Sequence, residues 1–335
     1  MSSSVTLGKH TGLVHLPRTF RLEGGGTIDS GHVAFEDLGA RRGPAVLVLG
    51  GISAGRHVGS SPNDPTPGWW ESYVGEGRAI DTRSLRVLGI DWLGGAGASS
   101  GPAGSGLGAA FPVVHSIDQA RAIALLLDRL GIRKLRAIVG SSFGGMVALA
   151  FAQEFPERIA RIVAIGAAHE SRPLASAWRS VQRRILELGL ETGTERRAVA
   201  IARSLATATY RSAQEFAARF SGPPDGERLP VEGYLESRGE AYAERFDAAS
   251  YRLLSLAIDL HRVEPERIPA PATLVGFDTD QLVPADQVRE LASRLAGPVD
   301  LHVLASIYGH DAFLKEVDAV GEIVRTALSR KEVAP

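Results

Sequence analysis

The sequence predicts an α/β protein with a doubly wound, mostly parallel sheet and a helical lid insertion. Short, continuously apolar runs bounded by glycine recur along the chain, as expected of strands buried on both faces of a parallel sheet. Amphipathic helical patterns separate these runs, and this alternation is typical of doubly wound folds. The alternation stops within residues 171–269, which are rich in Ala, Arg, Glu and Leu. We therefore predict a core of residues 1–170 and 270–335, with residues 171–269 forming the lid.

Size and composition are compatible with one large domain that carries an insertion, since the chain has 335 residues. A hydrophobic content of 44% and a charged content of 22% are ordinary for a soluble enzyme. The net charge is −1, with both signs interleaved, and gives no support for binding to nucleic acid or to an anionic membrane. The absence of cysteine excludes disulfides, thiolate zinc sites and a cysteine nucleophile. The N-terminal stretch lacks a signal-peptide pattern and no apolar run reaches membrane-spanning length, so we expect a cytoplasmic protein.

Six apolar runs are predicted to form the core strands: 45–50, 85–91, 135–140, 161–168, 272–278 and 301–305. Between the second and third runs, "SIDQARAIALLLDRLGI" predicts a helix in which Ser116 and Gln119 fit a capping box. In the lid, residues 174–188 have apolar positions at a four-three spacing, and "SAQEFAARF" and "AASYRLLSLAIDL" predict further helices. Residues 51–68 and 94–108 are predicted to be long loops, which are often functional.

The stretch G-S-S-F-G, residues 140–144, matches the pattern G-x-S-x-G with Ser142 at its centre. It lies between an apolar strand and an apolar helix, where this pattern forms a sharp turn that projects a serine hydroxyl above the sheet. Ser141 is the rival position, but it lacks the second flanking glycine in register. The other interpretation is a glycine-rich turn with a capping serine. We predict that Ser142 is a nucleophile.

The same turn predicts a chain order of serine, acid and histidine, with each residue after a later strand. His310 in "YGHDAFL" follows the last predicted strand, and "LVGFDTDQLVP" offers Asp278 and Asp280 after the strand before it. Chain order does not decide between these two aspartates. His310 would accept the proton of Ser142, and the aspartate would hold the imidazole in the required tautomer.

A serine nucleophile of this kind also needs backbone N–H groups that stabilise an oxyanion. The N–H of Phe143 begins the helix after Ser142 and is one candidate donor. The second donor is expected from the loop after an earlier strand, here "LGGISAGRHV", and we predict the N–H of Ile52.

Seven motifs occur in order along the chain: "GWWESYVGEGRAIDT", "GIDWLGGAGASSGP", "SFGGMVALAFA", "PERIARIVAIGAA", "ATYRSAQEFAARF", "VEGYLESRGEAYAERFDAASY" and "YGHDAFL". With them the sequence resembles the homoserine O-acyltransferases of the α/β-hydrolase fold over nearly its whole length. Members transfer an acetyl or succinyl group from CoA to L-homoserine without a permanently bound cofactor, and many are homodimers through the lid helices. The resemblance implies that Ser142, Asp280 and His310 form the catalytic triad, and it favours Asp280 over Asp278.

The resemblance also implies three contacts with the amino-acid substrate. Arg211 of "TYRS" would bind the carboxylate, to which a planar guanidinium can bind in a bidentate way. Asp311 would bind the ammonium, and Tyr234 of "VEGYLESRG" would add a hydrogen bond. Without the resemblance, Arg211 is interpreted as a solvated charge on the lid.

The sequence departs from the acetyl-transferring members in three places. It has "GGISAG" in place of "HALTGS", "GSSFGGMVALAFA" in place of "GGSMGGMQALEWA", and Arg179 in place of Asn in the pattern "AW-x-x-VQR". Burial of the terminal carboxylate of a succinyl group is costly without a cation, so Arg179 near the acyl site is predicted to favour succinyl-CoA. The other interpretation is that Arg179 is a solvated lid residue, like Arg183 and Arg184.

The resemblance therefore predicts transfer of a succinyl group from succinyl-CoA to the hydroxyl of L-homoserine, through an acyl-enzyme on Ser142, in methionine biosynthesis. Homoserine O-acetyltransferase and serine O-succinyltransferase are alternatives, since one methylene is worth only about 1–3 kcal/mol in a pocket. A serine esterase or other hydrolase of the same fold is the third alternative, and Arg211 together with Asp311 argues against it. A non-catalytic binding module would leave the three matched triad positions unexplained.

Overall fold

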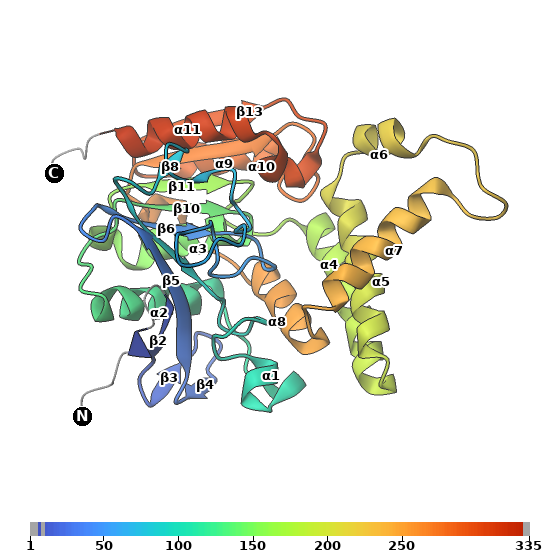
Figure 1. Ribbon diagram of the computed structural model, residues 1–335, viewed down its shortest axis with the longest axis horizontal. Coiled ribbons are helices and arrows are strands. Elements are labelled where there is room, and N and C mark those ends of the chain that lie inside the picture. The colour runs from blue at the N-terminus through green and yellow to red at the C-terminus, as the bar shows by residue number, and fades with distance from the viewer. Residues whose placement is uncertain (1–5, 8–10, 331–335) are drawn as a thin grey trace.

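The computed structural model describes residues 6–7 and 11–330, and its centre is a nine-stranded sheet (Figure 1). The strands are β1 (Thr6–Leu7), β2 (Thr11–His15), β5 (His32–Gly39), β6 (Ala45–Leu49), β9 (Arg86–Ile90), β10 (Ala137–Ser141), β11 (Ile162–Ile165), β12 (Ala272–Phe277) and β13 (Val299–Leu304). Their spatial order is β1-β2-β5-β9-β6-β10-β11-β12-β13. The first four strands in this order pair antiparallel, and all later pairs are parallel. This mostly parallel sheet confirms the predicted fold class.

The remaining strands and the helices outside residues 171–269 complete the core. They are β3 (Thr19–Arg21), β4 (Thr27–Asp29), β7 (Val74–Gly75), β8 (Ile80–Asp81), α1 (Pro102–Ser105), α2 (Ser116–Arg129), α3 (Phe143–Glu154), α9 (Ala285–Arg294), α10 (Ala312–Lys315) and α11 (Val317–Ser329). Helices α2, α3 and α9 contribute to an apolar core on one face of the sheet, and α11 contributes to a second core on the other face.

Strands β6, β10 and β11 are buried along their whole length because both faces of the sheet are covered. In β6, Leu47 and Leu49 belong to the core that contains α2 and α3, whereas Val46 and Val48 belong to the core that contains α11. Burial on both faces explains why the strands have continuous apolar runs rather than an alternating pattern. All six predicted core strands are confirmed to within two or three residues at each end.

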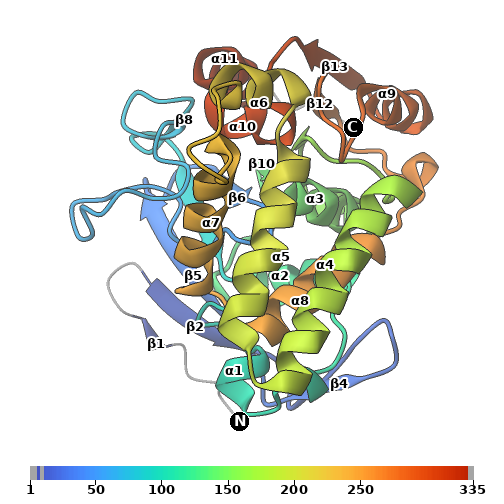
Figure 2. The same cartoon turned by 90° about the vertical axis from the view of Figure 1, so that its right-hand side faces the viewer.

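Five helices lie between β11 and β12, namely α4 (Pro173–Thr192), α5 (Glu195–Tyr210), α6 (Ala213–Phe220), α7 (Pro230–Ala243) and α8 (Ala248–Asp259). We call residues 171–269 the helical segment. Helices α4, α5 and α7 lie side by side across one end of the molecule, and α8 packs beneath α4 and α5 (Figure 2). The segment is as helical as predicted, and its status as a separate lid stays a prediction.

Helix α2 begins one residue earlier than its sequence pattern predicts. His115 is the N-cap residue, and Asp118 accepts a hydrogen bond from the His115 N–H at 2.8 Å. The predicted capping box of Ser116 and Gln119 is therefore wrong. Both side chains make tertiary contacts instead, because Ser116 Oγ lies 2.7 Å from Nδ1 of His261 and Gln119 bonds to the backbone that follows β9.

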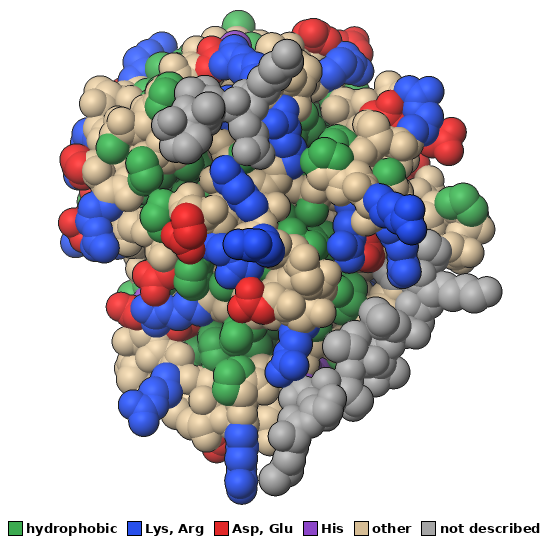
Figure 3. All heavy atoms as spheres, turned by 90° about the vertical axis from the view of Figure 1, so that its left-hand side faces the viewer, with side chains coloured by type: hydrophobic (Ala, Val, Ile, Leu, Met, Phe, Trp, Pro, Cys, Tyr) green, Lys and Arg blue, Asp and Glu red, His purple; other side chains and the backbone are tan. Residues whose placement is uncertain are grey.

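The surface opposite the helical segment has basic and acidic side chains interspersed with apolar ones, in keeping with the near-zero net charge (Figure 3). Among the described residues, no helix is both long enough and apolar enough to cross a membrane. The N-terminal stretch that was considered for a signal-peptide pattern lies partly outside the described residues.

Candidate active site

Ser142 occupies the turn between β10 and α3 in a backbone conformation that is rare for a residue with a side chain. Its φ is 53° and its ψ is −122°. In the described part of the chain, Ser30 is the only other residue besides glycines with a positive φ. A conformation of this kind costs about 1–3 kcal/mol and persists only where the surrounding packing enforces it.

The packing that enforces the turn depends on its two flanking glycines. A Cβ atom on Gly140 would lie 2.3 Å from the carbonyl oxygen of Gly144, and a Cβ on Gly144 would lie 2.4 Å from the carbonyl oxygen of Leu49. Backbone atoms cannot move aside as a flexible side chain can. Both positions of the G-x-S-x-G pattern therefore exclude any side chain.

Ser142, His310 and Asp280 form a chain of hydrogen bonds. His310 Nε2 lies 2.8 Å from Ser142 Oγ, and His310 Nδ1 lies 2.7 Å from Asp280 Oδ2. The other carboxylate oxygen of Asp280 accepts hydrogen bonds from the N–H groups of Leu282 and Val283, at 2.8 and 3.0 Å. With Nδ1 donating to Asp280, Nε2 of the neutral imidazole is free to accept the serine proton.

The geometry separates the two aspartates that chain order left open. Asp278 is exposed, and its carboxylate accepts a hydrogen bond from the N–H of Ser306 at 2.9 Å. It thus links the segment after β12 to the segment after β13, while Asp280, two residues later, contacts His310.

The charge state of His310 is set by opposing effects. Burial lowers the pKa of His310, whereas the negative charge of Asp280 and the hydrogen bond to it raise this pKa. Asp311 also raises it and Arg179 lowers it, and the net result is a pKa above the usual value for histidine. The imidazole is thereby made a stronger base than an isolated histidine.

The two backbone N–H groups predicted to stabilise an oxyanion are available. Among the described residues, no group accepts a hydrogen bond from the N–H of Ile52 or of Phe143. Trp92 Nε1 donates to the carbonyl oxygen of Gly51 at 3.1 Å and so fixes the loop that carries Ile52. Ile52 lines the same cavity as Ser142.

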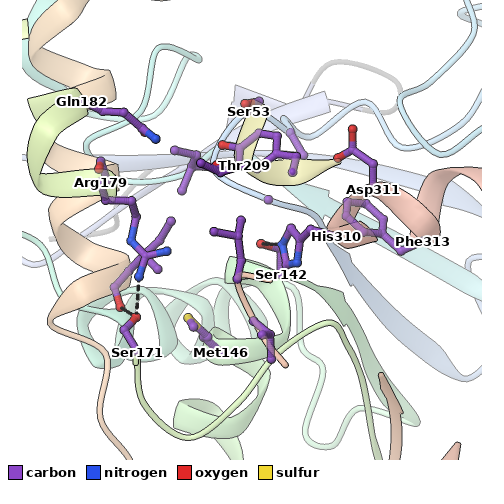
Figure 4. Close-up of a pocket in the computed structure, with 18 of the residues that line it drawn as sticks. Ser53, Ser142, Met146, Ser171, Arg179, Gln182, Thr209, His310, Asp311 and Phe313 are labelled. Atoms are coloured by element: carbon purple, nitrogen blue, oxygen red, sulfur yellow. Dashed lines mark hydrogen bonds between the residues drawn. The ribbon is translucent and has the colours of Figure 1, made fainter. Parts of the chain in front are cut away.

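That cavity has a volume of about 190 Å³ and lies beneath the helical segment. Its volume exceeds that of a roughly 150 Å³ cavity that binds benzene, so it can hold a small organic group. Its walls come from the loop of residues 51–54, the turn at Ser142, helices α4, α5 and α8, and the loop that carries His310. Figure 4 shows Ser142 and His310 between Arg179 on one side and Asp311 on the other.

Arg179 lines the cavity and is not a solvated lid residue. Its side chain is 10% exposed. Nε donates to Asp259 Oδ1 at 2.7 Å. Nη2 donates to Ser171 Oγ at 3.0 Å (Figure 4). The interpretation of Arg179 as a solvated residue is therefore wrong, while its role toward the acyl group stays a prediction.

Arg211 does not line the cavity, contrary to what a direct contact with substrate requires. It follows α5, is buried, and donates from Nη1 to Glu215 at 2.7 Å. Its Nε lies 3.0 Å from Asp311 Oδ2, an ion pair that is not aligned as a hydrogen bond. Asp311 does line the cavity, so Arg211 contacts a residue of the site without lining the cavity itself.

Tyr234 also lies outside the lining of the cavity. Its ring packs against Phe220 at 5.1 Å between centroids, and the Arg219 guanidinium lies 4.4 Å from its centroid. These contacts join α6 to α7. A hydrogen bond from Tyr234 to a substrate in the cavity is not compatible with this position.

Arg203 is a cavity residue that sequence reasoning missed. Its guanidinium carbon lies 5.1 Å from the ring centroid of Tyr210 and 4.5 Å from that of Tyr242. Among the described residues it forms no ion pair with a carboxylate. Arg203 and Tyr210 are seven positions apart and so lie on the same face of α5. This spacing was a readable signal, whereas Arg211 lies just beyond the end of the helix.

No metal centre is evident in the part of the chain that the structure describes, since no three His, Asp or Glu side chains come together there as potential ligands.

Comparisons with known proteins place this site in a family. Residues 44–317 match the alpha/beta hydrolase fold family. A homoserine O-succinyltransferase of Xanthomonas campestris pv. campestris is 41% identical over 298 residues, which are 88% of this chain and 78% of that protein. The chain belongs to the homoserine O-acyltransferases of the α/β-hydrolase fold. An L-serine/homoserine O-acetyltransferase of Streptomyces lavendulae is 35% identical, over 94% of this chain and 96% of that protein.

Solved structures agree with this assignment at the level of the fold. A homoserine O-acetyltransferase from Bacillus anthracis superposes with a TM-score of 0.86 over 97% of this chain and 99% of that one, at 21% identity. Esterase E22 superposes with a TM-score of 0.85 over 95% of this chain and 99% of that one, at 23% identity. The homoserine O-acyltransferase fold is thus shared with an esterase, so the fold alone does not separate transfer from hydrolysis.

The raised pKa of His310 predicts the acid side of the pH profile. His310 must be neutral to accept the serine proton, so kcat/KM should fall as the pH drops through a pKa that lies above the usual histidine value of about 6.5. Asp280→Asn removes the attraction that raises this pKa. It should move the acid limb to lower pH and reduce kcat by about 10⁴-fold.

The measurement is the pH dependence of CoA release. Asp278→Asn is the matched control, because this exposed aspartate accepts a hydrogen bond from Ser306 and makes none with His310. An acid limb that stays in place in Asp280→Asn would show that another group titrates.

Proposed function

We propose that this chain is a homoserine O-succinyltransferase that takes succinyl-CoA as co-substrate and uses no permanently bound cofactor. The observation that carries the proposal is the placement of Ser142 between two charged groups, Arg179 on one side and Asp311 on the other, in a cavity that Arg203 also lines. A simple esterase has no need of a zwitterion clamp. We further propose that the enzyme acts in the cytoplasm, in methionine biosynthesis.

In the first half-reaction, His310 accepts the proton of Ser142 Oγ as this oxygen attacks the thioester carbonyl of succinyl-CoA. The N–H groups of Ile52 and Phe143 stabilise the resulting oxyanion. The C–S bond then breaks, and the CoA sulfur takes the proton from His310. The products are free CoA and a succinyl ester on Ser142.

In the second half-reaction, the hydroxyl of L-homoserine takes the place of the serine hydroxyl. His310 accepts its proton, its oxygen attacks the succinyl ester, and the serine is released with the proton returned by His310. The hydroxyl of L-homoserine must be held in place, because a bound and oriented reactant has a much higher effective concentration than water that is not held. Arg203 binds the carboxylate of L-homoserine in this proposal, and Asp311 binds its ammonium group.

This assignment replaces Arg211 with Arg203 as the group that binds the amino-acid carboxylate. Arg203 lines the cavity and lacks a carboxylate partner among the described residues, whereas Arg211 already contacts Glu215 and Asp311. We therefore propose that Arg211 holds Asp311 in place. Tyr234 has no part in substrate binding in this proposal.

The choice of succinyl over acetyl rests on Arg179. A buried guanidinium next to the nucleophile can bind the terminal carboxylate of a succinyl group, which an acetyl group lacks. The 41% identical relative is described as a succinyltransferase, and the 35% identical one as an acetyltransferase that also uses serine. Homoserine O-acetyltransferase and serine O-succinyltransferase are therefore the alternatives that the experiment must separate.

The enzyme is also proposed to be a homodimer that pairs through the helical segment. Leu174, Val181 and Leu188 recur at every seventh position of α4 and are 60%, 46% and 59% exposed. Such a stripe on an outer helix is typical of helix pairing. Val181→Glu should convert a dimer into a monomer in sedimentation, and a monomeric wild type would contradict the proposal.

CoA release from the purified protein tests the proposed reaction. Succinyl-CoA and acetyl-CoA are each combined with L-homoserine, L-serine or no acceptor. We expect the highest kcat/KM for succinyl-CoA with homoserine and none in Ser142→Ala beyond background. Faster turnover with acetyl-CoA would identify an acetyltransferase, and equal rates without an acceptor would identify a hydrolase.

Removal of Arg203 tests the amino-acid subsite. Arg203→Met should raise the KM for L-homoserine by about 10- to 100-fold, since a charged hydrogen-bond partner is worth about 1.5–3 kcal/mol. Slow hydrolysis of succinyl-CoA by water should persist, because water needs no carboxylate contact. Arg197→Met, an exposed arginine on the same helix, is the matched control. Equal losses of transfer and hydrolysis would refute the clamp.

A further inference from the structure

A second arginine shares the carboxylate partner of Arg179. Asp259, the last residue of α8, accepts from Arg179 Nε at Oδ1, and its Oδ2 lies 2.6 Å from Arg183 Nη1. Arg179 and Arg183 are four residues apart and project from the same face of α4. All three side chains are 15% exposed or less. This cluster, of which Arg179 lines the cavity, therefore contains two positive charges and one negative charge.

Nearby carboxylates do not balance this excess. Glu170 also lines the cavity, but it pairs with Arg262 at 2.8 Å. Asp259 has its remaining contact with Ser176, whose hydroxyl donates to Oδ1 at 2.8 Å. In the part of the chain that the structure describes, Arg179 Nη1 has no hydrogen-bond partner.

The two arginines have different access to the cavity. Arg179 lines it, and Figure 4 shows its side chain on the cavity wall beside Ser171. Arg183 does not line it, and its Nη1 bonds instead to the carbonyl oxygen and Oγ of Ser255, at 3.3 and 3.2 Å. Arg183 can therefore affect a ligand in the cavity mainly through Asp259.

We propose that Arg183 is a positioning residue that keeps Asp259 from neutralising Arg179, and so preserves one uncompensated positive charge for the terminal carboxylate of the acyl group. This inference rests on the proposed succinyl transfer. If Asp259 paired with Arg179 alone, it would repel the terminal carboxylate of the succinyl group. This repulsion would offset much of the attraction of that carboxylate to Arg179. With Arg183 in place, the two arginines are balanced by Asp259 together with the terminal carboxylate of the bound succinyl group.

The same charge balance selects against acetyl-CoA. An acetyl group leaves the excess positive charge without a partner in a site from which water is displaced, and this raises the energy of the complex. Arg183 thus contributes to specificity without touching the substrate.

The test compares kcat/KM for succinyl-CoA and acetyl-CoA, with L-homoserine as acceptor, in the wild type and in Arg183→Met. The ratio of succinyl to acetyl should fall by about tenfold or more, through a higher KM for succinyl-CoA rather than a lower kcat. Arg183→Lys keeps the charge and should keep most of the ratio. Arg184→Met, the exposed neighbour on α4, is the matched control and should leave the ratio unchanged.

A double variant separates charge balance from a structural role. Asp259→Asn combined with Arg183→Met restores a single positive charge on Arg179, and the amide oxygen still accepts from Nε. The ratio should therefore recover to within about threefold of the wild type. A structural role predicts that the double variant is worse than either single one. If Arg183→Met cannot be purified, a low ratio in the double variant still overturns the proposal.

The wild-type ratio tests the proposed function by itself. A wild type that prefers acetyl-CoA overturns both the succinyltransferase assignment and this inference. A wild type that prefers succinyl-CoA, with an unchanged ratio in Arg183→Met, overturns only the role of Arg183.

Discussion

The close approach of backbone at the end of β10 is the constraint on which the site depends. Gly140 and Gly144 have no room for a Cβ, so α3 starts directly against β6 and β10. This packing holds Ser142 at a φ of 53°, where its hydroxyl reaches Nε2 of His310. The N–H of Phe143 stays without an acceptor for the same reason, because it lies at the first position of the helix. In the proposed mechanism, one tight turn therefore supplies both the nucleophile and an oxyanion donor.

The helical segment adds charge to a site whose geometry the sheet provides. Strand ends supply Ser142, Asp280 and His310, while α4, α5 and α8 supply arginines and the carboxylate that pairs with two of them. Buried charges are costly unless they are paired, and each of these arginines is stabilised differently. Arg179 shares Asp259, whereas Arg203 rests on two tyrosine rings. Within the described part of the chain, neither Arg179 nor Arg203 is fully paired with a carboxylate of its own, so each can bind an anionic group of a ligand.

The sequence predicts the parts of this structure that depend on local pattern. Buried strands show continuous apolar runs, and the turn at Ser142 shows its two glycines, so the sheet and the chain order of serine, aspartate and histidine could be read directly. The choice of Asp280 over Asp278 came only from the family resemblance. Contacts between distant segments could not be read. The capping box predicted at Ser116 was wrong because its hydroxyl bonds to His261 instead. Arg203 was missed because the cavity that it lines forms only when α5 packs over the sheet.

The groups that favour transfer over hydrolysis are expected outside the central sheet. An esterase and a homoserine O-acetyltransferase both superpose on this chain with TM-scores of 0.85 or more, so the fold alone does not distinguish a water acceptor from an amino-acid acceptor. The distinction must come from groups that hold the acceptor and the acyl tail on either side of Ser142. In the mechanism proposed above, those groups are Arg203 and Asp311 for the acceptor and the Arg179–Asp259–Arg183 cluster for the acyl tail. In that proposal the charge at each place depends on paired side chains, so specificity is a property of side-chain pairs rather than of single residues.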